Sequence, residues 1–136
     1  MGIFSSMDIS ASGLFAQRVR LDVIANNIAN ANTTRTPAGG PYRRQEVVLS
    51  TRAGVFDPKD AGVQVDAIVE SPLPPKRVYD PSHPDAGPDG IVAFPNVNIV
   101  EEMVDLITAT RAYEANVAAV NAARSMASKA LEIGRG

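Results

Sequence analysis

The chain has 136 residues, 45% of them hydrophobic, and a formal net charge of −2, which favours one domain with a modest apolar core. This charge provides no basic field that could neutralise phosphates, so nucleic acid is not expected as a partner. The lack of cysteine excludes disulfides and thiolate metal sites. No segment approaches the roughly 20 apolar residues of a transmembrane helix, so no direct membrane span is expected.

The first predicted element is an amphipathic helix over residues 6–31. We expect Ser5 to cap it, Asp8 to favour its positive end, and Ser12 with Gly13 to weaken its first turns. Four apolar residues recur at every seventh position, which places them in one stripe on a helix. These expected packing residues are Met7, Leu14, Leu21 and Ile28.

Four asparagines gather near the expected end of this helix, at positions 26, 27, 30 and 32. One interpretation is a fraying C-terminus, because asparagine suits helix ends. The other is that Asn26 and Asn30, four residues apart on one face, hydrogen-bond to neighbouring chains. They would then set the register between subunits, as a buried asparagine does in coiled coils. The pattern leaves both interpretations open.

The middle of the chain is predicted to be β-rich. All ten prolines lie between Pro37 and Pro95, which excludes long helices from this part. Runs of β-branched residues predict strands over residues 42–50 and 62–70, and weaker candidates over 77–79 and 91–94. The turn-rich run over residues 80–90 is expected to be a loop.

A second and longer helix is predicted over residues 98–133. Asn98 is its expected N-cap, and Gly134 stands where a left-handed residue would end it. Apolar residues follow a four-three repeat along this segment, interrupted by Thr110 and Arg124. Its expected packing residues are Ile99, Met103, Leu106, Tyr113, Val117, Val120 and Leu131.

These elements predict a mainly α protein with a small β-rich insertion. The long terminal helices, in segments 1–33 and 98–136, are expected to pair as an antiparallel coiled coil. The Pro/Gly-rich, β-rich segment 34–97 connects them. Nine alanines and several branched residues extend around the second helix, more than one partner helix can cover. We therefore expect other subunits to cover them, and each helix to be only partly formed in the isolated chain. The alternative is a monomeric helical hairpin capped by a small sheet.

The sequence predicts no catalytic, cofactor-binding or metal-binding residue, and therefore no enzyme. His83 lies in the turn-rich run, where a turn role is expected. Glu101, Glu102 and Asp105 occupy the first turns of the second helix, where the helix dipole favours negative charge.

Several motifs resemble those of a known family. The segment ANNIANANTT at residues 25–34 resembles the N-terminal signature of flagellar rod and hook proteins. The segments GGPYRR, YDPSHP, PNVNIVEEMVD and RAYEANV, which begin at residues 39, 79, 95 and 111, resemble the proximal-rod members of that family. The resemblance covers nearly the whole chain. Residues 34–41, inserted before Tyr42, depart from the hook and distal-rod pattern and are interpreted as a proximal-rod trait.

The resemblance implies a structural subunit of the flagellar basal-body proximal rod. Such proteins pair their terminal helices, stack helically into a hollow rod, transmit motor torque and form the wall of the export channel. The implied partners are other rod proteins, the chain itself and the basal-body adaptor protein at the rod base, with the type III export apparatus in transit. The implied location is the periplasm-spanning rod. The first 15 residues contain no Lys or Arg and no unbroken apolar run, so export without a cleaved signal peptide is expected. The alternative function is a non-flagellar secreted coiled-coil adaptor or chaperone.

Overall fold

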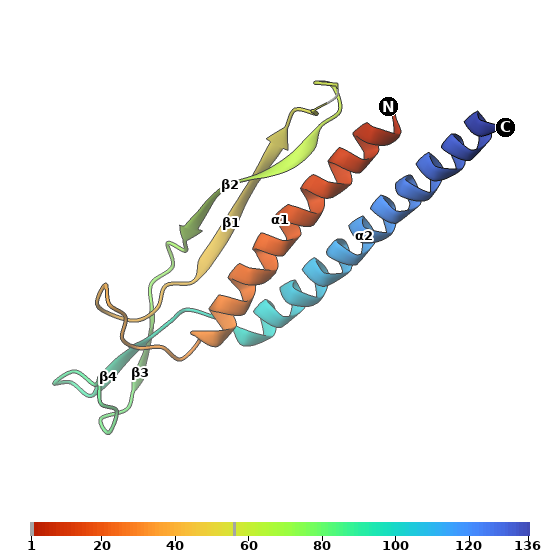
Figure 1. The fold of residues 1–136 in the computed structure, drawn as a ribbon. Coiled ribbons are helices and arrows are strands. Elements are labelled where there is room, and N and C mark those ends of the chain that lie inside the picture. The colour runs from red at the N-terminus through yellow and green to blue at the C-terminus, as the bar shows by residue number, and fades with distance from the viewer. Residues whose placement is uncertain (1, 56) are drawn as a thin grey trace.

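The structure, a computed structural model, describes residues 2–55 and 57–136. Met1, which belongs to the predicted N-terminal segment, lies outside the described residues. The elements are α1 (Ile3–Ala29), β1 (Gln45–Arg52), β2 (Gly62–Glu70), β3 (Lys76–Tyr79), β4 (Ile91–Phe94) and α2 (Ile99–Arg135). The two long helices lie side by side, and the chain termini lie at the same end of the molecule (Figure 1). The predicted fold class, mainly α with a small β-rich insertion, is confirmed.

The two helices run antiparallel. Asn27, near the end of α1, donates a hydrogen bond of 3.4 Å to Glu102 in the first turn of α2. Gly13 lies two heptads before Asn27 on α1, and Asn116 lies two heptads after Glu102 on α2. Gly13 lies against the side chain of Asn116. A Cβ atom at position 13 would lie 2.9 Å from Asn116 Oδ1, so the lack of a side chain at Gly13 permits this close approach.

The helix boundaries correct three expectations. Helix α1 begins at Ile3, and Gly2 occupies its N-cap position. Ser5 is buried inside the first turns and is therefore not the cap. Helix α2 continues through Gly134 to Arg135, and Gly136 is its C-cap residue. The predicted N-cap of α2 is confirmed, since Asn98 Oδ1 accepts from the backbone amides of Val100 and Glu101 at 3.1 and 3.4 Å.

The strands form two antiparallel pairs. In the first, β1 pairs with β2 from Gln45↔Glu70 to Arg52↔Gly62, with a register shift between Val48 and Leu49. In the second, β3 pairs with β4. The strands predicted over 62–70 and 91–94 are confirmed. The strand predicted over 42–50 begins three residues later than expected, at Gln45. The backbone amide of Tyr42 instead donates to the carbonyl oxygen of Thr33 at 3.0 Å.

Helix α1 is the central layer of the molecule. It packs against α2 on one side and against β1 and β2 on the other, while within the described residues α2 packs against no strand. Two side chains of α1 hold the far end of the hairpin: Asp8 pairs with Arg52 at 3.0 Å, and Ser12 Oγ accepts from the amide of Val63 at 3.1 Å. Asp8 and Ser12 therefore attach the hairpin to α1, which the sequence did not indicate.

The apolar core is thin and consists mainly of small side chains. Its members among the described residues are Ala16, Val23, Ile24, Ala31, Val92, Val97, Ala109 and Ala123. Over the same residues, neither helix contains a stretch that is both long and apolar enough to cross a bilayer.

Candidate functional site

Helix α2 buries little of its surface within the chain. Among its 37 residues, all of which the structure describes, the buried ones are Glu102, Ala109 and Ala123. Large apolar side chains are exposed at both ends of the helix, up to 70% at Val100 and 80% at Ile133. A helix with this much uncovered apolar surface is typical of a protein that packs against neighbours.

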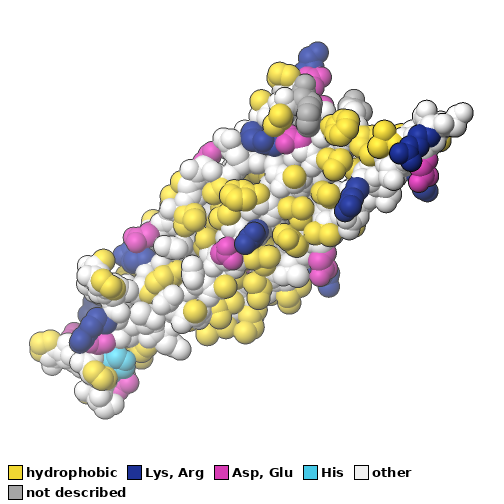
Figure 2. All heavy atoms as spheres, in the orientation of Figure 1, with side chains coloured by type: hydrophobic (Ala, Val, Ile, Leu, Met, Phe, Trp, Pro, Cys, Tyr) yellow, Lys and Arg dark blue, Asp and Glu magenta, His cyan; other side chains and the backbone are white. Residues whose placement is uncertain are grey.

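Four of these side chains form one patch at the start of α2, which we call the outer face. Their spacing places them on neighbouring turns of one side of the helix. The outer face consists of Val100, Met103, Val104 and Ile107, each at least half exposed. Figure 2 shows hydrophobic side chains gathered over the region where α2 begins.

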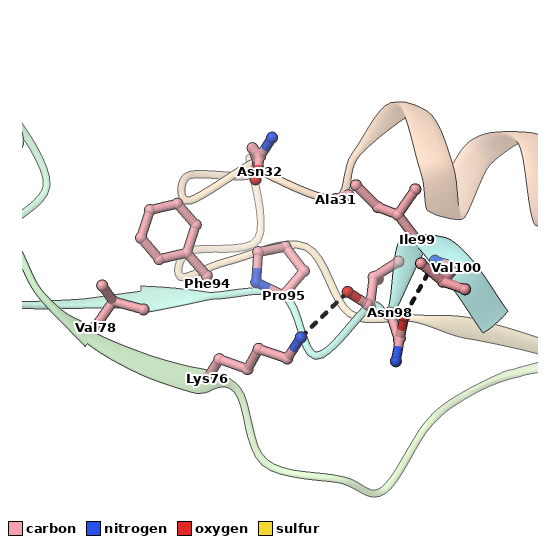
Figure 3. Close-up of a pocket in the computed structure, with 10 residues that line it drawn as sticks. Ala31, Asn32, Lys76, Val78, Phe94, Pro95, Asn98, Ile99 and Val100 are labelled. Carbon is pink, nitrogen blue, oxygen red and sulfur yellow. Dashed lines mark hydrogen bonds between the residues drawn. The ribbon is translucent and has the colours of Figure 1, made fainter. Parts of the chain in front are cut away.

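A shallow groove adjoins the outer face (Figure 3). Its walls come from the chain just after α1, from the β3–β4 pair and from the start of α2. The apolar lining includes Val78, Phe94, Val97 and Ile99. Lys76 borders it and donates to the carbonyl oxygen of Val97 at 3.4 Å. Since Val100 belongs to both features, groove and outer face form one continuous apolar surface.

The predicted packing residues divide into two groups. Ile99, Met103 and Leu131 are exposed, so they are available to neighbours. The other predicted residues are half-buried: Met7, Leu14, Leu21, Ile28, Leu106, Tyr113, Val117 and Val120.

The side of α2 that faces α1 is carried by a different heptad series. Its members recur at every seventh residue and are Glu102, Ala109, Asn116 and Ala123. The observed series begins at Glu102, one residue before the predicted packing residue Met103. The prediction missed it because small and polar side chains do not mark a seam by hydrophobicity.

A cluster of polar side chains joins α1, α2 and the start of β1. We call it the polar junction; its members are Asn27, Tyr42, Arg44, Gln45 and Glu102. The side chain of Asn27 is 1% exposed. Its Nδ2 donates to the carbonyl oxygen of Gln45, and its Oδ1 accepts from the amide of Gln45 and the hydroxyl of Tyr42, each at 2.9 Å. The amide of Asn27 thus pairs with both backbone groups of Gln45, as a neighbouring strand would.

Glu102 completes the polar junction from α2. Its carboxylate is 1% exposed and accepts from Asn27 Nδ2 and from Arg44 Nε. Burial lowers the pKa of Arg44, but the hydrogen bond and the charge of Glu102, with a further contribution from Glu46, outweigh this and raise it. Burial and the negative charges of Glu102 and Glu70 raise the pKa of Tyr42. The junction therefore holds a charged Arg44 and a neutral phenol.

The asparagines singled out from the sequence occupy different places. Asn26 is exposed. Asn30 makes local contacts, because its Nδ2 donates to the carbonyl oxygen of Asn26 at 2.9 Å and its Oδ1 accepts from Thr33 at 3.1 Å. The buried member of the cluster is Asn27. Contacts of Asn26 and Asn30 with other subunits remain a prediction.

The inserted segment 34–41 contacts the loop over residues 80–90. Thr34 Oγ1 donates to Asp85 at 2.6 Å, and Arg35 forms an ion pair with the same carboxylate. The hydrogen bond from Thr34, together with Arg35, lowers the pKa of Asp85 against the opposing effect of burial. In the loop, His83 Nδ1 accepts from the amide of Asp85 at 3.0 Å, which gives His83 a turn role as predicted.

Across residues 2–55 and 57–136, no group of three or more His, Asp or Glu side chains is placed to hold a metal ion.

The total solvent-exposed area of the chain is larger than expected for a compact monomer of its mass. A compact monomer of 14.4 kDa is expected to expose about 6,800 Å², whereas this chain exposes 8952 Å². A standard protein interface buries about 800 Å² per partner. The excess is therefore larger than two such interfaces.

Known proteins match the same terminal regions. The family model described as "Flagella basal body rod protein" matches residues 7–35, and "Flagellar basal body rod FlgEFG protein C-terminal" matches residues 89–133. The flagellar basal-body rod protein FlgC of Borreliella burgdorferi is 48% identical over 152 aligned positions, which cover 100% of both chains. The chain belongs to the FlgC family of flagellar basal-body rod proteins.

Other FlgC proteins match over the same length. Those of Bacillus subtilis and Salmonella typhimurium are 44% and 42% identical, over 99% of this chain and 100% of the relative. FlgC-family membership makes the chain a structural component of the flagellar rod and does not favour the non-flagellar adaptor. The two family models fall on α1 and on the segment ending in α2, the helix that carries the outer face.

Proposed function

We propose that this FlgC-family chain is a structural, non-enzymatic subunit of the proximal rod. Segments 1–33 and 98–136 form the inner layer, where α1 and α2 pair as a coiled coil, and the β-rich segment 34–97 lies outside it. Helices of successive subunits form the wall of the export channel and transmit motor torque through many interlocked contacts. The rod crosses the periplasm.

The proposed partners are other rod proteins, further copies of the chain and the basal-body adaptor protein at the rod base. The type III export apparatus is a partner in transit. The proposed interface and packing residues come from both helices and are Met7, Leu14, Leu21, Asn26, Ile28, Asn30, Ile99, Met103, Leu106, Tyr113, Val117, Val120 and Leu131.

The observation that carries the proposal is the exposed apolar surface of α2. The outer face adjoins the apolar groove. It lies on the side of α2 opposite the heptad series, Glu102 to Ala123, that faces α1. Burial of apolar surface is worth about 25 cal/mol per Å² removed from water. Packing against neighbouring subunits would therefore supply stabilisation that the thin core of one chain does not.

The test introduces a charge on the outer face. Val104→Asp and Ile107→Asp alter side chains that are 57% and 56% exposed, so folding of the isolated chain should change little. In an assembled rod the same carboxylate would be buried without a partner, at a cost of several kcal/mol. We expect both variants to be expressed and exported but absent from purified basal bodies, and the cells not to swim. Ile107→Leu, which keeps the face apolar, is the matched control. Normal swimming of both aspartate variants would refute the proposed interface.

A further inference from the structure

We infer that Glu102 is a positioning residue that fixes the axial register between α1 and α2, by docking into a receptor built from Asn27 and Arg44. This role concerns how one chain aligns its own helices. It therefore goes beyond the proposed function and does not depend on which neighbours bind.

Packing alone specifies this register weakly. The seam between the helices contains Ala16 on α1, and Ala109 and Ala123 on α2, spaced by two heptads. A slide of α2 by one heptad would bring Gly13 opposite Ala109 or Ala123, and either alanine is smaller than the Asn116 that Gly13 now accommodates. Dispersion contacts of such small side chains differ little between registers.

Asn116 itself does not lock the alignment. Its Nδ2 donates to the carbonyl oxygen of Ala112 within α2 at 2.9 Å, so this hydrogen bond would travel with the helix in any register. The half-exposed side chain also has room to reorient.

Glu102 distinguishes the registers because its hydrogen-bond partners lie outside α2 and would not move with it. Asn27 is on α1, and Arg44 immediately precedes β1, which Asn27 attaches to α1 through Gln45. A slide in one direction would carry Glu102 beyond the end of α1. A slide in the other would place it near Arg20, which is exposed, so the new ion pair would be a solvated one worth little. Either slide separates a carboxylate that is 1% exposed from the Asn27 and Arg44 donors that satisfy it. A buried asparagine specifies register in coiled coils by the same penalty.

Substitution of Glu102 can test register without dismantling the rest of the junction. Asn27 keeps its two hydrogen bonds to Gln45, and Arg44 keeps its ion pair with Glu46. A leucine at position 102 is apolar and of similar size, and Arg44, whose side chain is 26% exposed, is not left buried without a partner. Glu102→Leu should therefore retain the helix pair while losing its choice of register.

The chain has no cysteine, so introduced thiols can report the alignment. Gly13→Cys with Asn116→Cys reports the observed register. Gly13→Cys with Ala109→Cys or Ala123→Cys, each with Asn116→Ala to relieve crowding, reports the two registers slid by one heptad. Oxidation is followed in the purified full-length chain, in a folding osmolyte such as trimethylamine N-oxide, and the intramolecular disulfide is scored by monomer mobility.

The parent chain should cross-link mainly in the observed register, with the slid registers as minor products. Glu102→Leu should raise cross-linking in the slid registers by about tenfold, the change in equilibrium expected from one buried polar contact. Glu102→Gln, which can still accept a hydrogen bond, should restore the parent pattern, and Glu101→Leu on the exposed side should leave it unchanged. Slid cross-links as abundant in the parent as in Glu102→Leu, or the observed register alone in Glu102→Leu, would overturn the inference. Loss of every cross-link in Glu102→Leu would also overturn it, because Glu102 would then be required for pairing itself.

Discussion

The buried carboxylate of Glu102 accepts a hydrogen bond from the guanidinium of Arg44, 58 residues earlier in the chain. This pair connects the first turn of α2 to the residue that precedes β1. Together with Asn27, it ties the β-rich segment to both helices at the end of the molecule where α1 finishes. The other end of the hairpin is tied by Asp8 and Arg52. The segment is therefore held at two points, so it should follow any movement of the helices.

Removing the Glu102 carboxylate should destabilise the fold. We expect Glu102→Ala to cost about 3 kcal/mol, the lower end for breaking a buried ion pair, because Arg44 is partly exposed and keeps Glu46. The measurement is the osmolyte concentration at the midpoint of folding, followed by circular dichroism. Glu101→Ala, on the exposed side of the same turn, is the control. Equal midpoints for the two variants would contradict the role of the pair.

Asn27 should protect the start of β1 from exchange. In Asn27→Ala the Gln45 amide loses its acceptor, which should weaken its protection by about 1–3 kcal/mol. Hydrogen exchange at the Gln45 amide, measured by NMR in osmolyte, reports this directly. Asn26→Ala, one residue away and exposed, should leave the rate unchanged. Unaltered exchange in Asn27→Ala would mean that the bond is dispensable.

The contact between the inserted segment and the 80–90 loop should depend on pH. The Thr34 hydrogen bond and Arg35 hold the pKa of Asp85 below its ordinary value. The ionised form therefore contributes stability above the unfolded pKa of about 3.9, and this contribution is lost as pH falls through the folded pKa. An NMR titration of Asp85 should give a midpoint below the ordinary value, and Thr34→Val should raise it. The same midpoint in both chains would exclude Thr34 as the principal cause.

A charge within the helix pair should block rod assembly. Leu21 and Val117 are half-buried, so Leu21→Asp or Val117→Asp would place an unpaired carboxylate in packed surroundings, at a cost of several kcal/mol. We expect expression and export to continue, while rod incorporation and motility should be lost. Swimming assays and immunoblots of basal bodies measure this. Wild-type motility in both variants would rule out the packing role.

His83 should matter only locally. Its ring lies edge-on to Phe94 at 5.7 Å and accepts from the amide of Asp85, contacts worth about 1 kcal/mol. His83→Ala should therefore loosen the β3–β4 loop, seen as faster exchange there, without affecting swimming. A severe motility defect would assign His83 a role beyond the turn.

The sequence predicted the parts of the fold that follow from backbone chemistry. Prolines confined the helices to the two ends, a run of β-branched residues located β2, and Asn98 marked the start of α2. It could not place the seam between the helices, because Ala109 and Ala123 are not distinguished from the other alanines of α2 by their side chains. Helical periodicity ranks residues by hydrophobicity, so the contact between Gly13 and Asn116 was not detectable from the pattern.

The polar junction could not be predicted from the sequence for a related reason. Glu102 sits where a first-turn carboxylate is favoured by the helix dipole, and that local explanation was sufficient by itself. Its burial depends on Arg44 and Asn27, which approach only after the hairpin folds back along α1. In the asparagine cluster, Asn27 and its neighbours are chemically alike, and only the tertiary position of Gln45 separates them.

In the proposed rod, neighbouring subunits cover the apolar surface that one chain leaves exposed. Hydrogen exchange of the α1 and α2 amides, compared between the purified chain in dilute buffer and intact basal bodies, tests this most directly. We expect rapid exchange along both helices in the free chain and strong protection in the rod. Strong protection of both helices in the free monomer, lost in one cooperative melting transition, would contradict the claim.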